Sequence, residues 1–192
     1  MRKQNKLIAL LALLVSWAIL AAIFWCWIFT FLTDPPSDQK VTLYVDATAC
    51  RETDLALQLE QNMPEGIRMV KVHRFSYAMF GGDALRASDL YLIREPEKET
   101  CMDWLAPLPE EFRDRADLFA PDGTPVGILV YDPTKGGCFA PEYMTFAVPG
   151  EEETKVWLAF GAGSPRLDAS PDGPDEAVTA VVRSLLTMME PQ

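Results

Sequence analysis

Polar side chains follow three predicted strands of this chain at the points where the strands end. Strands are predicted at residues 41–46, 68–75 and 90–93, because β-branched, aromatic and other apolar residues dominate them or alternate along them. In an open α/β sheet, ligands bind at the carboxyl ends of the strands. The polar side chains at these ends suit a small polar or anionic ligand, and they are Asp46, Thr48, Arg51, Ser76, Tyr77 and Arg94. The competing interpretation is purely structural, since the same residue types cap strands and form turns.

Histidine and cysteine give no predicted catalytic residue. His73 is the single histidine. A catalytic dyad would need its imidazole within hydrogen-bond reach of the thiol of Cys50 or Cys101. A lone histidine inside a predicted strand is more often structural or exposed. No cysteine pair has the spacing of metal ligands, so we expect no catalytic residue, no metal and no cofactor. Cys50, Cys101 and Cys138 allow at most one disulfide among themselves, and the sequence leaves the pairing open.

Helical patterns alternate with these strands. Leu55, Leu59 and Met63 recur at intervals of four and predict a helix over 52–63, which ends at Pro64-Glu65-Gly66. Further helices are predicted over 77–86 and 95–105. This alternation is typical of an α/β fold, and we expect three layers with a mostly parallel sheet in the middle.

The second half of the chain continues with strands over 126–131, 143–148 and 156–160. A final helix is predicted over 175–189, because proline and acidic residues stand where a helix begins. Its broad apolar stripe consists of Val178, Val181, Val182, Leu185, Leu186 and Met189. We expect this helix to close the core and the strand over 41–46 to lie at or near the centre of the sheet.

A run of 26 residues, 7–32, contains neither a charged residue nor a proline. As a helix it would be roughly 39 Å long, enough to cross a hydrocarbon core of about 30 Å. Arg2, Lys3 and Lys6 precede the run, which predicts a cytoplasmic N-terminus and an extracytoplasmic C-terminal part.

A cleaved signal peptide is the alternative interpretation of this run. Signal peptides have an apolar region of about 7–15 residues that ends in small residues of the A-x-A kind. The present run is longer, and no such triplet ends it. The sequence therefore favours an uncleaved anchor and a cell-membrane protein with a single span.

The resulting layout has a cytoplasmic tail (1–6), a transmembrane helix (7–32), a linker (33–40) and one extracytoplasmic domain (41–192). All 28 acidic residues and 14 of the 17 basic residues follow the run, so this part carries a net charge of −14. Such a charge argues against nucleic acid as a partner and against docking on anionic lipid. The predicted partners are the lipid bilayer, through 7–32, and a protein or a second copy at the outer face.

Three motifs resemble those of the extracellular solute-binding proteins of ABC transporters. Residues 87–93 (ASDLYLI) are similar to the small-x-Asp-hydrophobic strand that follows the second helix in that family. Residues 122–128 (DGTPVGI) resemble its D-G-x-x-Y-G-I strand. Residues 157–165, followed by the helix over 175–189, are similar to its returning strand and C-terminal helix. The resemblance spans most of 41–189 and implies a domain like one lobe of that fold.

The chain departs from this family between Tyr131 and Val156, where about 25 residues stand in place of an entire second lobe. Capture of a solute by closure of two lobes is therefore not available to one copy. We expect a non-enzymatic interaction or sensing module that is a truncated, single-lobe relative of the family. The alternatives are a low-affinity solute-binding or transporter accessory protein and a small cell-surface hydrolase, which would need a nucleophile, a base and an orienting group in one cleft.

Overall fold

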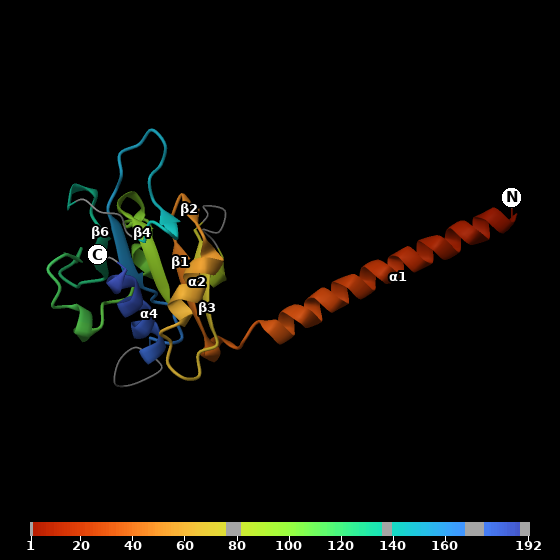
Figure 1. The fold of residues 1–192 in the computed structure, drawn as a ribbon, viewed down its shortest axis with the longest axis horizontal. Helices are drawn as coiled ribbons and strands as arrows, with labels where there is room; N and C mark the ends of the chain where they lie inside the picture. The colour runs from red at the N-terminus through yellow and green to blue at the C-terminus, as the bar shows by residue number, and fades with distance from the viewer. Residues whose placement is uncertain (1, 76–81, 136–139, 168–174, 189–192) are drawn as a thin grey trace. The chain divides into compact units, whose positions relative to one another are not determined.

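The computed structural model describes residues 2–75, 82–135, 140–167 and 175–188 (Figure 1). The chain divides into two compact units, Met1–Pro36 and Ser37–Gln192. The first unit contains the helix α1 (Arg2–Thr33), and the strands and the other helices of the described residues belong to the second.

The helix α1 covers the whole apolar run predicted from the sequence. Its segment Leu10–Phe29 is long and apolar enough to cross a membrane, and none of that segment is buried within the protein. The large apolar side chains along it, from Leu10 to Phe29, are each more than half exposed except Ile28, which is partly exposed. A helix that is apolar on every face and lacks protein packing is suited to an apolar environment.

The second unit is an α/β domain built on one six-stranded sheet, whose strand order is β3-β1-β4-β8-β6-β5. The strands β3, β1 and β4 are mutually parallel, whereas β8 is antiparallel to both β4 and β6, and β5 is antiparallel to β6. The bounds are β1 (Lys40–Val45), β3 (Met69–Arg74), β4 (Leu90–Arg94), β5 (Leu118–Phe119), β6 (Gly127–Tyr131) and β8 (Val156–Phe160).

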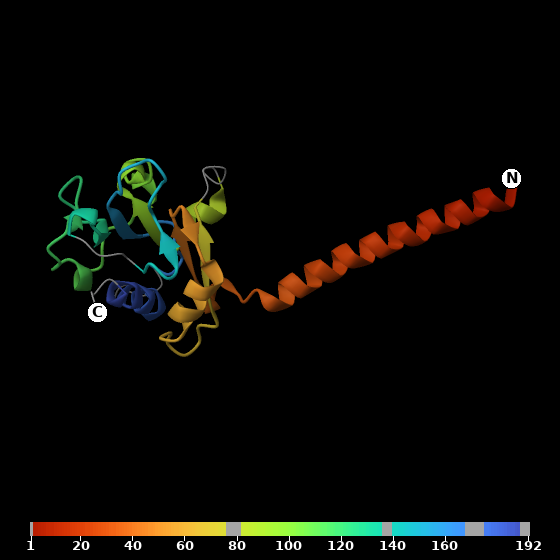
Figure 2. The same ribbon diagram turned by 45° about the horizontal axis from the view of Figure 1, so that its top comes forward.

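Helices cover both faces of the sheet. The helices α2 (Glu52–Glu60) and α4 (Glu176–Thr187) lie on the same side, as Figure 2 shows, and pack into the larger hydrophobic cluster. The opposite face carries a smaller, aromatic cluster that includes Leu85 of α3 (Asp83–Arg86) and Trp104 of the 3₁₀ turn η4 (Met102–Trp104). Because both faces are covered, β8 is buried at every residue.

The predicted helix at the C-terminus is confirmed as α4. Its apolar stripe is buried from Val178 to Leu186, with Val178, Val181, Val182 and Leu185 fully inaccessible to solvent, whereas Met189 lies outside the described residues. Asp175 caps the helix, since its side chain accepts a hydrogen bond from the N–H of Ala177 at 2.9 Å.

The prediction of a mostly parallel sheet was wrong, because the sheet is mixed. Parallel neighbours need a connection that crosses from one end of the sheet to the other. The connection over 132–155 instead leaves β6 and enters β8 at the same end of the sheet, so the two strands run antiparallel. The strand β1 is an interior strand between β3 and β4, and the two central strands are β4 and β8.

The prediction of a helix over 95–105 was also wrong. The segment forms two 3₁₀ turns, η3 (Glu95–Glu97) and η4. Cys101 and Trp104 are both buried, and their spacing of three residues matches the period of a 3₁₀ turn. Leu105 then turns to extended backbone and forms a bridge with Gly161, which ends the helical geometry.

The helix predicted over 77–86 falls partly on residues 76–81, which lie outside the described residues, and its last four positions form α3. Two other predicted elements are shorter than expected. The strand predicted over 143–148 is reduced to β7 (Met144–Thr145), which pairs antiparallel with β2 (Ala49–Cys50) as a separate two-stranded sheet. The helix predicted over 52–63 ends at Glu60.

The strand β3 lies at an edge of the sheet, and α2 protects that edge. Glu60 accepts the backbone N–H of Val70 at 2.9 Å, and Glu52 accepts that of Arg74 at 2.8 Å. The two glutamates, at the two ends of one helix, thus occupy N–H groups that point away from β1. Covering an edge strand with a helix is a common defence against pairing with another chain.

The remaining helical turns of the described residues are short 3₁₀ segments in the connections. They are η1 (Ser37–Gln39), η5 (Glu110–Phe112) and η6 (Pro133–Lys135).

Candidate functional site

Asp46 and Arg94 meet where the parallel strands β1 and β4 end. Nε of Arg94 donates to Oδ2 of Asp46 at 2.9 Å, and Nη2 donates to Oδ1 at 3.0 Å. The side chain of Asp46 is 8% exposed and that of Arg94 is 17% exposed. The chain passes from β1 to β3 on one side and then to β4 on the other, so this pair lies at the topological switch point where α/β proteins bind ligands.

The Asp46–Arg94 pair uses both carboxylate oxygens, and the backbone N–H of Arg94 also donates to Asp46 Oδ2, at 3.3 Å. A two-pronged pair of this kind is geometrically specific and strong. An anionic ligand at Arg94 would have to displace Asp46 and leave a nearly buried carboxylate without its cation, which is costly. The pair therefore suits a structural clamp between two strand ends better than an open anion site.

Thr48 and Arg51 lie beside the two-stranded sheet that β2 forms with β7. The N–H of Thr48 donates to Thr145 O at 2.8 Å, and its hydroxyl donates to Phe146 O at 3.4 Å. Arg51 pairs with Asp54 at 3.0 Å, and its Nη1 donates to the main-chain oxygen of Glu142, just before β7. Its side chain nevertheless stays 67% exposed. The segment around β7 thus covers part of the predicted site and leaves Arg51 at the surface.

Ser76 and Tyr77, the other two predicted site residues, lie outside the described residues. The last described residue before them is Phe75, whose N–H donates to Val45 O at 2.7 Å. Four of the six predicted positions can therefore be placed, and two of these, Asp46 and Arg94, contact each other directly.

Among the described residues, the thiols of Cys50 and Cys101 and the imidazole of His73 do not have the properties of a nucleophile and a base. Burial raises the pKa of Cys50 to about 11 and that of Cys101 to about 12, so both thiols stay protonated near neutral pH. Burial lowers the pKa of His73, whose ring packs against Tyr44 with centroids 5.2 Å apart. Cys138 lies outside the described residues. In the part of the chain that the structure describes, no three His, Cys, Asp or Glu side chains are grouped closely enough to hold a metal ion.

A cluster that the sequence did not predict stands directly after Arg94. Lys98 pairs with Glu95, and its Nζ lies 4.7 Å from the ring centroid of Phe119 and 5.3 Å from that of Trp157. The indole N–H of Trp157 also donates to Glu95. The one local signal for this cluster is the i, i+3 spacing of Glu95 and Lys98, since its aromatic members are distant in sequence.

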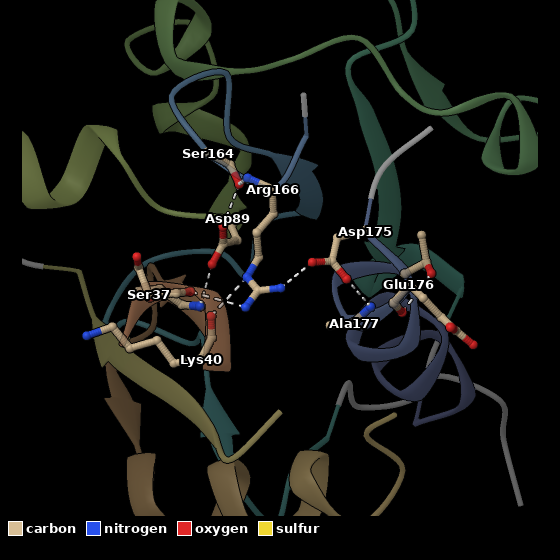
Figure 3. Close-up of polar contacts among 10 residues, drawn as sticks. Ser37, Lys40, Asp89, Ser164, Arg166, Asp175, Glu176 and Ala177 are labelled. Carbon is tan, nitrogen blue, oxygen red and sulfur yellow. Dashed lines mark hydrogen bonds and ion pairs between the residues drawn. The ribbon is translucent and has the colours of Figure 1, made fainter. Parts of the chain in front are cut away.

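A second polar cluster lies at the opposite ends of β1 and β4 (Figure 3). Arg166 is 5% exposed and joins three segments, because it donates to Lys40 O at 3.0 Å and Ser37 O at 3.1 Å and pairs with Asp175. Asp89 accepts the N–H of Thr42 at 2.8 Å and the hydroxyl of Ser164.

This second cluster has the character of a structural network. Burial raises the pKa of Asp89 even though the bonds from Ser164 and Thr42 and the nearby Arg166 oppose that effect. The turn that carries Ser164 packs very closely, since a Cβ added to Gly161 would lie 1.9 Å from the main-chain oxygen of Ser88. The network ties the entry of the domain, around Ser37, to β4 and to the cap of α4.

A groove of about 540 Å³ lies between the end of α2 and α4. Its walls mix amide, hydroxyl and apolar residues with one glutamate and one arginine, and they are contributed by Gln58, Asn62, Pro64, Glu176, Ala180, Arg183, Ser184, Thr187 and Met188. Arg183 pairs with Glu111, and both side chains are substantially exposed. The groove holds no arrangement of groups that points to a particular ligand.

No family model matches this chain, and no curated protein matches it. The fold and the site define the class that the structure supports: a mixed α/β domain that follows an apolar helix long enough to span a membrane. The relationship to one lobe of a solute-binding protein stays a prediction that rests on the sequence motifs.

Proposed function

We propose that the protein is a single-pass membrane protein with its α/β domain outside the cytoplasm. The observation that carries this proposal is α1, an uninterrupted helix with an uncharged segment of exposed apolar side chains. The basic residues Arg2, Lys3 and Lys6 support a cytoplasmic N-terminus. Trp25 and Trp27 stand toward the other end of the segment, where aromatic rings favour the level of the lipid headgroups.

A signal sequence has the same apolar and basic pattern, so cleavage is the decisive property. We favour an anchor because the apolar segment exceeds the usual length of a signal peptide and lacks a terminal A-x-A triplet. N-terminal sequencing of the protein isolated from its native membrane tests this. A chain that begins at Met1 or Arg2 supports the anchor, whereas a mature chain that begins between Ala22 and Gln39 would refute it.

The orientation can be tested by labelling intact cells with a membrane-impermeant maleimide. The variant Glu152→Cys places a thiol on an exposed part of the domain, and Lys3→Cys places one on the predicted cytoplasmic tail. We expect labelling above the wild-type background for Glu152→Cys alone. The opposite result would show that the domain is cytoplasmic.

For the domain we propose a non-enzymatic role in contacts with another protein or a second copy. Two observations support this role: Asp46 and Arg94 neutralise each other, and the segment around β7 partly covers the strand ends. Arg51, which remains two-thirds exposed, marks the accessible part of this surface. The net charge of −14 after the helix favours a partner with a basic surface.

A photo-crosslinking amino acid in place of Arg51 tests this surface in native membranes. We expect a discrete adduct with one protein or a second copy, and none when the same probe replaces the exposed Arg115. A solute that binds the full-length chain with micromolar affinity, and whose binding Arg51→Ala abolishes, would contradict the proposal and favour solute binding.

A further inference from the structure

The ammonium group of Lys98 occupies a small box of two aromatic rings and a carboxylate. Its Nζ pairs with Glu95 and lies 4.7 Å from the centroid of Phe119 and 5.3 Å from that of Trp157. The two rings are 5.8 Å apart and inclined at 51°. The Lys98 side chain is 18% exposed and that of Glu95 37%, so the box opens at the surface of the domain.

The walls of the box are anchored independently of Lys98. Phe119 belongs to β5 and is paired with Gly127 of β6. Trp157 belongs to β8 and is paired with Leu129, which is also in β6. Glu95 follows β4 directly, and its N–H donates to a main-chain oxygen next to β8 at 2.8 Å. The occupant, by contrast, is a long side chain with several rotatable bonds, carried by the residue that follows η3.

The chemistry of the box selects an alkylammonium group. A cation over the faces of a tryptophan and a phenylalanine is attracted by the ring quadrupoles, more strongly where water is excluded. Glu95 accepts an N–H from Lys98 and another from Trp157. Because the carboxylate accepts an N–H from the cation, a primary ammonium fits this site better than a quaternary one. The net charge of −14 also concentrates cations around the domain.

We propose that Glu95, Phe119 and Trp157 form a binding site for an external primary alkylammonium group, and that Lys98 closes this site when no ligand is present. The group can belong to a free amine or to a lysine side chain of a partner protein. A tethered occupant competes at a high effective concentration, so removing Lys98 should strengthen binding. This inference does not depend on the partner surface proposed around Arg51.

The test compares the full-length wild-type chain with Lys98→Ala in a nonionic detergent. The probes are n-butylammonium and Nα-acetyl-lysine methylamide, which represent the free amine and the protein lysine. Tryptophan is replaced by 5-fluorotryptophan, and binding is followed by ¹⁹F NMR of the five tryptophans. The variant Trp157→Phe assigns the resonance of interest.

We expect saturable shifts of the Trp157 resonance in Lys98→Ala, with a dissociation constant at least about tenfold lower than in the wild type. The matched control is Lys135→Ala, which removes a lysine that pairs with Asp117 on an exposed surface and should bind like the wild type. Adding Phe119→Leu or Glu95→Gln to Lys98→Ala should abolish the shifts. Binding of both probes indicates a site that accepts a protein lysine as well as a free amine. Binding of butylammonium alone indicates a site restricted to free amines.

The proposal is overturned if Lys98→Ala retains the wild-type circular dichroism but shows no saturable shift with either probe. It is equally overturned if Phe119→Leu leaves binding intact. Should Lys98→Ala unfold, Lys98→Gln keeps a polar side chain of similar length without the charge. A lack of binding in that variant counts against the proposal in the same way.

Discussion

Replacing Arg166 by methionine should destabilise the α/β domain by about 3–5 kcal/mol. Arg166 is the residue that joins the start of the domain to the cap of α4 (Figure 3). Methionine keeps much of the apolar stem of the side chain, so the substitution removes mainly the guanidinium and its bonds.

The magnitude follows from the contacts that the guanidinium makes. It donates to two main-chain oxygens, Lys40 O at 3.0 Å and Ser37 O at 3.1 Å, and a bond to a charged group contributes about 1.5–3 kcal/mol. The ion pair with Asp175 adds less, because that carboxylate is 29% exposed and can be hydrated. Total stabilities of domains are about 5–15 kcal/mol, so this loss is a large fraction.

Urea denaturation of the full-length chain in a nonionic detergent measures the change, with circular dichroism as the signal. Asp175→Asn should cost less than Arg166→Met but more than about 1 kcal/mol, because asparagine has one acceptor oxygen for the two donors that the carboxylate serves, the N–H of Ala177 and Nη1 of Arg166. Arg183→Met, which removes an exposed pair with Glu111, should cost less than about 1 kcal/mol. If Arg166→Met unfolds within 1 kcal/mol of the wild type, the cluster does not hold the domain entry, and the reasoning fails.

Three other substitutions test the core, the close turn and the ammonium box. Leu185→Asp should cost about 3–5 kcal/mol in the same assay because Leu185 is fully buried, whereas Leu57→Asp, at a position 57% exposed, should change stability by only about 0.5 kcal/mol. Gly161→Ala should destabilise strongly because its Cβ would lie 1.9 Å from a main-chain oxygen, and Gly127→Ala should be tolerated because its nearest contact is at 3.5 Å. Burial acts to raise the pKa of Glu95, but its hydrogen bonds outweigh that effect and hold the pKa below 4.5. The carboxylate therefore stabilises the fold above pH 4.5, and the stability advantage of the wild type over Glu95→Gln should shrink as the pH falls below that value; an advantage that grows there would refute the assignment.

The elements that could be predicted from the sequence are those specified by local patterns. The stripe of α4 and the apolar runs of β1 and β8 each carry their full signal within a dozen residues. Strand direction has no such local signal, because side chains alternate with the same period in parallel and antiparallel strands. The antiparallel pairing of β8 with β4 was therefore missed.

The prediction of an α-helix over 95–105, the segment after β4, was wrong for a different reason. Its composition permits a helix, but tertiary contacts decide between the α and 3₁₀ forms. Cys101 and Trp104 are drawn into the aromatic cluster, and Leu105 bridges to Gly161, a residue of the distant turn after β8. Such contacts override helix propensity.

The candidate site was predictable in position but not in pairing. The ends of β1 and β4 follow from their apolar runs, which places Asp46 and Arg94 correctly at strand ends. That the two side chains meet depends on the register of the strands, in which Val45 lies beside Leu92. The box around Lys98 depends on register as well, since it unites residues from β5, β8 and the turn after β4.

The protection of the β3 edge by α2 has a consequence for the behaviour of many copies together. Glu52 and Glu60 are carried by the helix whose Leu55 and Leu59 are buried against the sheet. One local opening of α2 would therefore uncover apolar surface and an unpaired strand edge at the same moment. In the proposed membrane-anchored form, copies held on a common membrane would meet more often than copies in solution, so the stability of this short helix would affect how long a crowded population stays unaggregated.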